Sequence, residues 1–182
     1  LHEFQEKQDV YISRITSNGR QSWVTFLGSS WNDGGTSIVL DQNDDLLISG
    51  YSHQSWHTPL NHQHRKGDYF TAKFNRFGQR KWVTFQGSVD FDHCQDMAVD
   101  GSGNIYLTGF SLQSWGNPIQ LHSGKHTQNG FAAKLDHGGS ITWNTFFGSA
   151  NAESVTGLIT DRDGNIIIIG HSSATWGDPI QG

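Results

Sequence analysis

The sequence is poor in several residue types: its 182 residues include one cysteine, one methionine and three prolines, and only 16% are charged. Because Cys94 is alone, no internal disulfide can form, and cysteine content leaves the redox compartment open. The longest apolar run is the four isoleucines at 166–169, far too short to span a membrane. Lysine and arginine are scattered and the formal net charge is −5, so we expect no nucleic-acid partner.

Glycine, in contrast, is abundant at 22 residues, and many of the glycines belong to an internal repeat. Trp23, Trp82 and Trp143 are separated by 59 and 61 residues, and six further positions keep this spacing. They are Gly28, Gly87 and Gly148; Asp41, Asp100 and Asp161; Gly50, Gly109 and Gly170; Ser52, Ser111 and Ser172; Trp56, Trp115 and Trp176; and Pro59, Pro118 and Pro179. This register identifies three tandem repeats of about sixty residues, approximately at 1–60, 61–120 and 121–182.

Each repeat contains four short runs rich in aromatic and β-branched residues, and none with helical periodicity. In the middle repeat these runs are 68–74, 81–87, 96–100 and 105–111, with turn sequences between them. Short apolar runs that are separated by glycine-containing turns are typical of antiparallel strands. Four such strands per repeat, in tandem, predict an all-β chain built as the four-stranded blades of a β-propeller.

The connections between the runs are of two kinds. "RFGQR" and "DGSGN" are short hairpin turns, whereas "SVDFDHC" and the loop that holds the second repeated Trp are long. Because successive strands alternate in direction, the short turns lie on one face of the sheets and the long connections on the other. Binding residues concentrate in loops, so we expect any function on this long-loop face.

The repeats resemble the SBBP family of bacterial β-propeller repeats over essentially the whole chain. The resemblance is carried by segments such as "WVTFLGS" at 23–29, "MAVDGSGNIYLTG" at 97–109 and "GFAAKLD" at 130–136. Two departures are a serine in place of the second glycine after the Trp strand, and the Trp-x-x-Pro loop itself. The resemblance implies a propeller fold and an exported bacterial protein, extracellular or on the cell surface, but no common activity. It also implies that the run at 37–41 is innermost in its blade and that the Trp-Thr-Phe runs are outermost.

The Trp loops are the first candidate for a binding site. In one interpretation their indoles are sugar platforms, because a flat apolar indole suits the C–H face of a saccharide. In the other, which we favour, each indole fills the joint between neighbouring blades, and the serine four residues earlier closes a local turn. The candidate ligand-binding residues are Trp56, Trp115, Trp176, Asn117, Asp178, Trp31 and Asp33. We expect Trp23, Trp82 and Trp143, on the strands, to be packing residues.

Carboxylates beside aromatic residues are what a saccharide-processing enzyme needs. Asp90 and Asp92 lie on the long-loop face, but they occur in one repeat only, and spacing places no second carboxylate beside them. We therefore expect them to be solvated loop acids, and we predict no catalytic residue.

Metal binding is suggested by "HQSWHTPLNHQH", which holds His53, His57, His62 and His64 within twelve residues. His62 and His64 would point to one side of an extended segment, and imidazoles ligate zinc, copper or nickel. The other repeats lack this cluster, so we expect a histidine-rich surface loop and no metal or cofactor. "DGSGN" and "DRDGN" resemble part of a calcium loop, but they lack its downstream glutamate and fit hairpin turns.

These patterns predict a non-enzymatic binding or scaffold module that holds a protein or a carbohydrate on its long-loop face. The alternatives are a lectin with one Trp-based sugar site per repeat, an enzyme with a single site on the same face, and a structural spacer in a surface assembly. Equivalent, exposed indoles would favour the lectin, convergent polar groups in a pocket the enzyme, and neither the spacer.

The register of the repeats also bears on assembly. The sequence begins within the third strand of a blade and closes after the second, which gives two whole blades, two half-blades and twelve strands. Because a three-bladed ring is not expected, two chains are predicted to form a six-bladed ring with two-fold symmetry, unless further blades of a longer chain complete it. Residue 1 is Leu1 and no signal peptide is present, so we expect a processed form or an excerpt.

Overall fold

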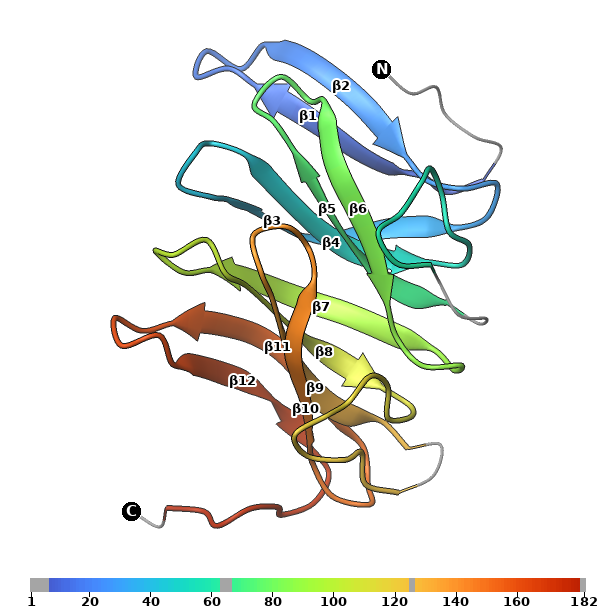
Figure 1. Ribbon diagram of the computed structural model, residues 1–182, viewed down its shortest axis with the longest axis vertical. Coiled ribbons are helices and arrows are strands. Elements are labelled where there is room, and N and C mark those ends of the chain that lie inside the picture. The colour runs from blue at the N-terminus through green and yellow to red at the C-terminus, as the bar shows by residue number, and fades with distance from the viewer. Residues whose placement is uncertain (1–6, 63–66, 125–126, 181–182) are drawn as a thin grey trace.

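The computed structural model describes residues 7–62, 67–124 and 127–180 (Figure 1). These residues form twelve strands and no helix, in four antiparallel sheets, which confirms the all-β class. The strands are β1 (Val10–Ile15), β2 (Gln21–Leu27), β3 (Asp33–Leu40), β4 (Leu46–Ser52), β5 (Asp68–Phe74), β6 (Arg80–Gln86), β7 (Asp92–Val99), β8 (Ile105–Ser111), β9 (Asn129–Leu135), β10 (Ile141–Phe147), β11 (Glu153–Thr160) and β12 (Ile166–Ser172).

The four sheets follow one another along the chain. β1 and β2 form the first sheet, β3 to β6 the second, β7 to β10 the third, and β11 and β12 the fourth, with sequential strands paired throughout. The sheets are stacked in this order from the N-terminal to the C-terminal end of the molecule (Figure 1). β7 packs against β3, β4 and β5, and β11 packs against β7, β8 and β9. The first strand of each sheet therefore lies against the preceding sheet.

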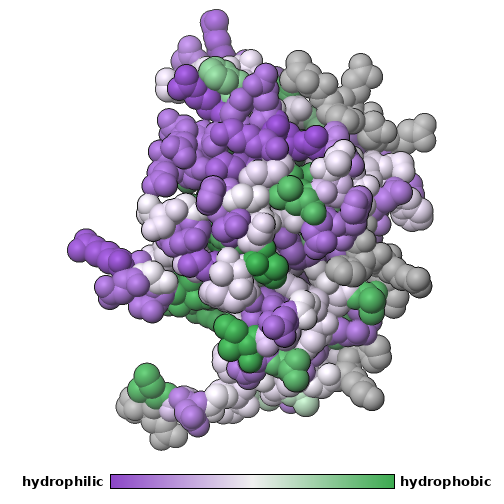
Figure 2. All heavy atoms as spheres, viewed as in Figure 1, coloured by the Kyte–Doolittle hydropathy of each residue, from purple (hydrophilic) through white to green (hydrophobic). Residues whose placement is uncertain are grey.

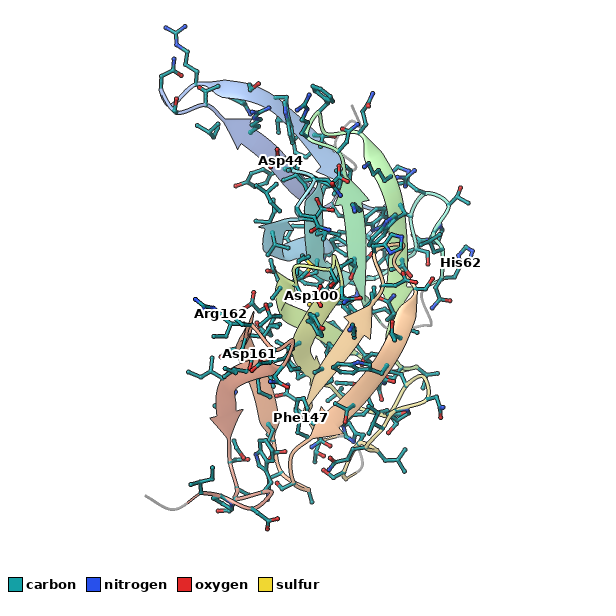
Figure 3. All side chains as sticks on the ribbon, turned by 60° about the vertical axis from the view of Figure 1, so that its left-hand side comes forward. Asp44, His62, Asp100, Phe147, Asp161 and Arg162 are labelled. Atoms are coloured by element: carbon teal, nitrogen blue, oxygen red, sulfur yellow. The ribbon has the colours of Figure 1, made fainter. Side chains whose placement is uncertain are left out.

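The hairpin turns and the long loops lie on opposite sides of the stack, as predicted. Asp44, Asp100 and Asp161, from the turns β3–β4, β7–β8 and β11–β12, lie on one side, and His62, from the β4–β5 loop, lies on the other (Figure 3). Each hairpin turn is stabilised by its own acid. Asp100 accepts hydrogen bonds from the backbone N–H groups of Ser102 and Asn104, both at 2.9 Å. These bonds make the turn motif a folding signal.

The strand bounds differ from the prediction at β7. β5 and β8 coincide with the predicted runs, whereas β7 begins at Asp92, within the segment "SVDFDHC" that was expected to be a long connection. The reason is a β-bulge, because the register between β7 and β8 shifts between Cys94 and Asp96. The extra residue breaks the alternation of apolar and polar side chains by which a strand is recognised. The same shift occurs in β3 and β11.

The repeated glycine of the second strand is required by the close approach of a neighbouring backbone. A Cβ atom on Gly109 would lie 1.9 Å from the carbonyl oxygen of His93, and one on Gly50 would lie 1.9 Å from that of Gly34. Gly170 has the same relation to Ser154, at 2.1 Å. Each of these glycines is therefore fixed by the bulge on the adjacent strand.

Two apolar cores lie between the sheets. The larger contains residues of both four-stranded sheets, including Leu47, Tyr69, Leu107 and Phe131. The second joins the first sheet to the second and includes Val10, Ile12, Phe70 and Phe85. The strand residues Trp23 and Trp82 pack at their edges, as predicted for packing residues.

Candidate functional site

Trp56 and Trp115, the indoles of the first two Trp loops, are 4% and 6% exposed. Trp115 lies edge-on to Phe131 and Phe146 of its own sheet, at centroid distances of 5.5 and 5.7 Å. It also meets Tyr69 of the preceding sheet at 5.7 Å. Trp56 makes the matching contacts within its own sheet. These two indoles fill the joints between sheets, which confirms the packing interpretation for them and leaves no sugar platform there.

Trp176, from the third Trp loop, is 43% exposed. It stacks on Phe147 of the preceding sheet, with centroids 6.3 Å apart and an interplanar angle of 18°. Its own sheet consists of β11 and β12, so the third and fourth strands that cover the other two indoles have no counterpart over Trp176. The three loop indoles are therefore not equivalent surface sites, as one lectin site per repeat would require.

An acid at the start of the first strand of each sheet pairs with the repeated serine of the second strand. The pairs are Asp33–Ser52, Asp92–Ser111 and Glu153–Ser172. The expectation that Asp92 occurs in one repeat only is therefore wrong. Its equivalents keep the spacing of 59 and 61 residues, but the third is a glutamate, which hides the register.

Asp92 shows how this acid–serine clamp is built. Its Oδ2 accepts hydrogen bonds from the backbone N–H of Ser88 at 2.5 Å and from the Ser88 hydroxyl at 2.9 Å. Its Oδ1 accepts from the hydroxyl of Ser111, which also contacts the carbonyl oxygen of Gln113 at 2.7 Å. Asp92 and the neighbouring Asp90 are buried, so the expectation of solvated loop acids is wrong as well. The clamp closes the local turn that was predicted around the repeated serine.

The protonation of the clamps depends on the residue beside them. Burial, together with the charge of Asp68, raises the pKa of Asp92 to about 7, although its hydrogen bonds act in the opposite direction. In the third clamp Asn129 takes the place of Asp68 and donates to Glu153 Oε2 at 3.1 Å. Burial also opposes the charge of Glu153, but its hydrogen bonds from Ser149, Ser172 and Asn129 outweigh burial and lower its pKa. An amide thus replaces a repelling carboxylate.

A cluster of stacked rings lies where the second and third sheets meet, at the long-loop ends of β4, β7 and β8. This ring cluster consists of Tyr51, His53, Phe91, His93 and Phe110. The His93 ring lies between the other two strand residues, with its centroid 5.3 Å from that of Tyr51 and 5.5 Å from that of Phe110. All five side chains are partly exposed, and none belongs to either apolar core.

His93 is the polar centre of the ring cluster. Burial lowers its pKa, so the imidazole is neutral at physiological pH. Its Nδ1 atom is buried and has no hydrogen-bond partner within the described part of the chain. A neutral imidazole among planar rings can stack on a flat apolar surface and can exchange one hydrogen bond with a ligand.

The sequence only partly indicates this cluster. The positions equivalent to Phe91 and His93 are Asn32 and Gly34 in the first repeat, and Ala152 and Ser154 in the third. The repeat does not need rings there, so the cluster is specific to one joint. His93 was recognised as a long-loop residue, but the stacking of rings from two sheets is not encoded in sequence spacing.

The other predicted site residues are dispersed. Trp31 is exposed, and the ammonium of Lys7 lies 4.3 Å from the centroid of its ring. Asn117 and Asp178 are exposed in the second and third Trp loops. Asp33 is buried and forms the first clamp through Ser29 and Ser52. No single pocket brings these residues together within the described ranges.

The predicted histidine segment is divided in the same way. His53 lies against Phe91 in the ring cluster, whereas His57 lies edge-on to Trp56. His62 is exposed, and His64 lies outside the described residues. Among the residues whose positions are described, no group of three or more histidine, cysteine, aspartate or glutamate side chains could hold a metal ion.

No protein-family model matches the chain, and no curated protein sequence matches it. No helix long and apolar enough to cross a membrane is present in the parts of the chain that the structure describes.

Proposed function

We propose that the chain is a non-catalytic binding and scaffold module of the β-propeller type, and that its ring cluster contacts the partner. The observation that carries the proposal is the contrast between side chains that recur and side chains that do not. The buried loop indoles and the acid–serine clamps recur in the repeats, and they are used to hold sheets together. The ring cluster occurs in one joint only and remains partly exposed on the long-loop face.

The buried clamps support a non-catalytic role. Asp33, Asp92 and Glu153 are all nearly inaccessible to solvent, and each is saturated by serine hydroxyl and backbone N–H groups. A carboxyl group that donates or accepts a proton in catalysis must lie within hydrogen-bonding reach of its substrate. The acids with raised pKa values therefore serve the fold in this proposal.

The chemistry of the ring cluster suits a protein or a carbohydrate. Both offer flat apolar surfaces, in an aromatic side chain or in the C–H face of a sugar, together with groups that can hydrogen-bond to an imidazole. The exposed Trp31 on the same face extends the aromatic surface. The resemblance to SBBP repeats further suggests that such a partner lies outside the bacterial cell.

Binding of an oligosaccharide array and of a displayed peptide library tests the proposal. We expect Phe91→Ala to weaken the bound species by more than about tenfold, because its ring supports both His53 and His93. Val89→Ala, at an exposed position in the same loop, is the matched control and should bind as the unaltered protein does. Binding that survives Phe91→Ala would contradict the assigned surface. Absence of binding to either library would favour a structural spacer.

A further inference from the structure

The two outer strands of the molecule are open edges. β1 pairs only with β2, and β12 pairs only with β11, in the order of strands within the described residues. In the two four-stranded sheets the equivalent strands pair directly with each other, as β4–β5 and β8–β9. One chain therefore carries both halves of a strand pair that it forms twice internally.

Apolar side chains along these edges are exposed only because the pairing is incomplete. Tyr11 of β1 is 68% exposed, whereas Phe70 and Phe131 at the same position of the repeat are completely buried. On β12, Ile169 is 71% exposed, and the buried Thr108 is its equivalent in the third sheet. Figure 2 shows more apolar surface over the lower half of the molecule, where the C-terminal sheets lie. Isolated exposed apolar residues are ordinary, but a series whose equivalents are all buried indicates a missing neighbour.

A groove runs between β1 and β3 at the place where that neighbour would lie. It consists of two adjoining cavities of about 430 and 500 Å³, which share Ile12, Ser13 and Ile38 in their lining. In the interior joints the corresponding space is filled, because β4 packs against β7 and β8 packs against β11. The groove thus has the position of a second strand of the repeat. β12 is a second strand whose outer edge is open.

We propose that β12 of one chain enters the groove between β1 and β3 of a second copy, so that two chains exchange strands. This rests on the proposed propeller architecture and gives its joint an exact register. The interior pairs Ile48↔Ala72 and Leu107↔Ala133 predict Ile168↔Ser13 between the chains.

The same repeat spacing fixes the rest of the joint. From Leu46↔Phe74 and Ile105↔Leu135 it follows that Ile166 pairs with Ile15 of the second copy. The alternation of side chains then directs Ile169 toward β3 of that copy, where Ile38 and Leu40 are exposed. Because both chains contribute the same two edges, the contact is self-complementary and closes with two-fold symmetry. Two mixed sheets and four internal sheets would complete a ring of six.

The mass of the 182-residue chain in solution tests whether the exchange occurs. We expect about 40 kDa by light scattering, twice the chain mass of 20.2 kDa. Ile169→Lys should raise the dissociation constant of this dimer by more than about tenfold, because the joint would bury an unpaired charge. The site is exposed in the single chain, so folding should be preserved. Val89→Lys adds the same charge at a position that is 55% exposed and lies away from both edges, and should remain a dimer.

A pair of cysteines tests the register. Chains with Ile168→Cys and chains with Ser13→Cys, mixed and oxidised, should form a covalent dimer, because paired strand residues have Cβ atoms close enough for a disulfide. Replacement of Ser13→Cys by Tyr11→Cys moves the thiol two residues along the same face and should reduce the yield severalfold. The native Cys94 is buried and does not compete.

Each outcome decides the proposal. A mass of about 20 kDa at all concentrations overturns it, and so does a dimer that Ile169→Lys leaves intact or a covalent yield that is equal for the two cysteine pairs. Binding at the ring cluster is measured separately with Phe91→Ala. A monomer that still binds its partner would therefore refute the exchange and leave the proposed function standing.

Discussion

At the scale of single residues, Trp115 illustrates how a loop side chain becomes part of the core. Its indole contacts three rings from two sheets, so its removal leaves a cavity that neither sheet can fill alone. We expect Trp115→Ala to lower the free energy of unfolding by about 3–5 kcal/mol, measured by urea denaturation. Trp31→Ala, at an exposed indole, should change it by less than about 1 kcal/mol. Equal losses in the two variants would contradict the packing role.

Asp92 gives the protein a pH dependence that can be isolated by substitution. Its pKa of about 7 in the folded protein exceeds the value of about 3.9 expected for an unfolded chain, so the folded state binds the proton more tightly. The stability that this proton provides is complete below about pH 4 and is lost as pH rises to about 7. Relative to the unaltered protein, Asp92→Asn should gain up to about 4 kcal/mol over this range, because the amide needs no proton.

Glu153→Gln is the matched control for the pH experiment. The pKa of Glu153 is lowered, so its charged form stabilises the folded state above the pKa of the unfolded chain. The variant should therefore lose stability relative to the unaltered protein as pH rises, which is the opposite trend. Unfolding midpoints measured between pH 4 and pH 8 give both trends. If Asp92→Asn and the unaltered protein show parallel curves, the carboxyl of Asp92 is ionised in the folded state.

At the scale of strands, the bulge and the repeated glycine act as one unit. A Cβ atom on Gly109 would overlap the carbonyl oxygen of His93, so Gly109→Ala must displace β7 from β8. We expect a loss of at least about 2 kcal/mol in the free energy of unfolding. Gly101→Ala, in the adjoining turn, has nothing within 4 Å of the added Cβ and should change it by less than about 0.5 kcal/mol. A neutral Gly109→Ala would show that the close approach is not needed.

Sequence periodicity predicts those elements whose signal is local. β5 and β8 are recovered to the residue because alternation is unbroken along them, and the hairpin turns because Asp100 and its equivalents bond to their own loops. The start of β7 is missed because a bulge interrupts its alternation. The third clamp is missed because a glutamate, Glu153, performs the role of an aspartate. These failures arise where one residue inserted or changed keeps the geometry but alters the pattern.

The ring cluster could not be predicted because it is assembled from two sheets. Tyr51 and His53 belong to the second sheet and its following loop, and Phe91, His93 and Phe110 to the third sheet and the loop before it. Their sequence separation has no period, and only the packing of β7 against β4 brings them together. Predicting such a site requires the arrangement of the sheets, whereas the buried indoles required only the repeat.

At the scale of the whole molecule, the repeat accounts for both what is closed and what is open. Two interior joints are sealed by an indole and tied by a clamp, and the same residue positions recur at the two open edges. The recurrence means that the edges are already shaped for each other. The proposed binding face and the proposed exchange of strands use different parts of the molecule, since the ring cluster lies between the second and third sheets.

Electron microscopy of the purified chain tests the central claim, that these sheets are the blades of a ring closed by a second copy. The account predicts disc-shaped particles in which six blades surround a central channel, with two-fold symmetry and a mass of about 40 kDa. It is contradicted by particles that contain a single row of four sheets, or by a closed ring whose joint does not place β12 beside β1.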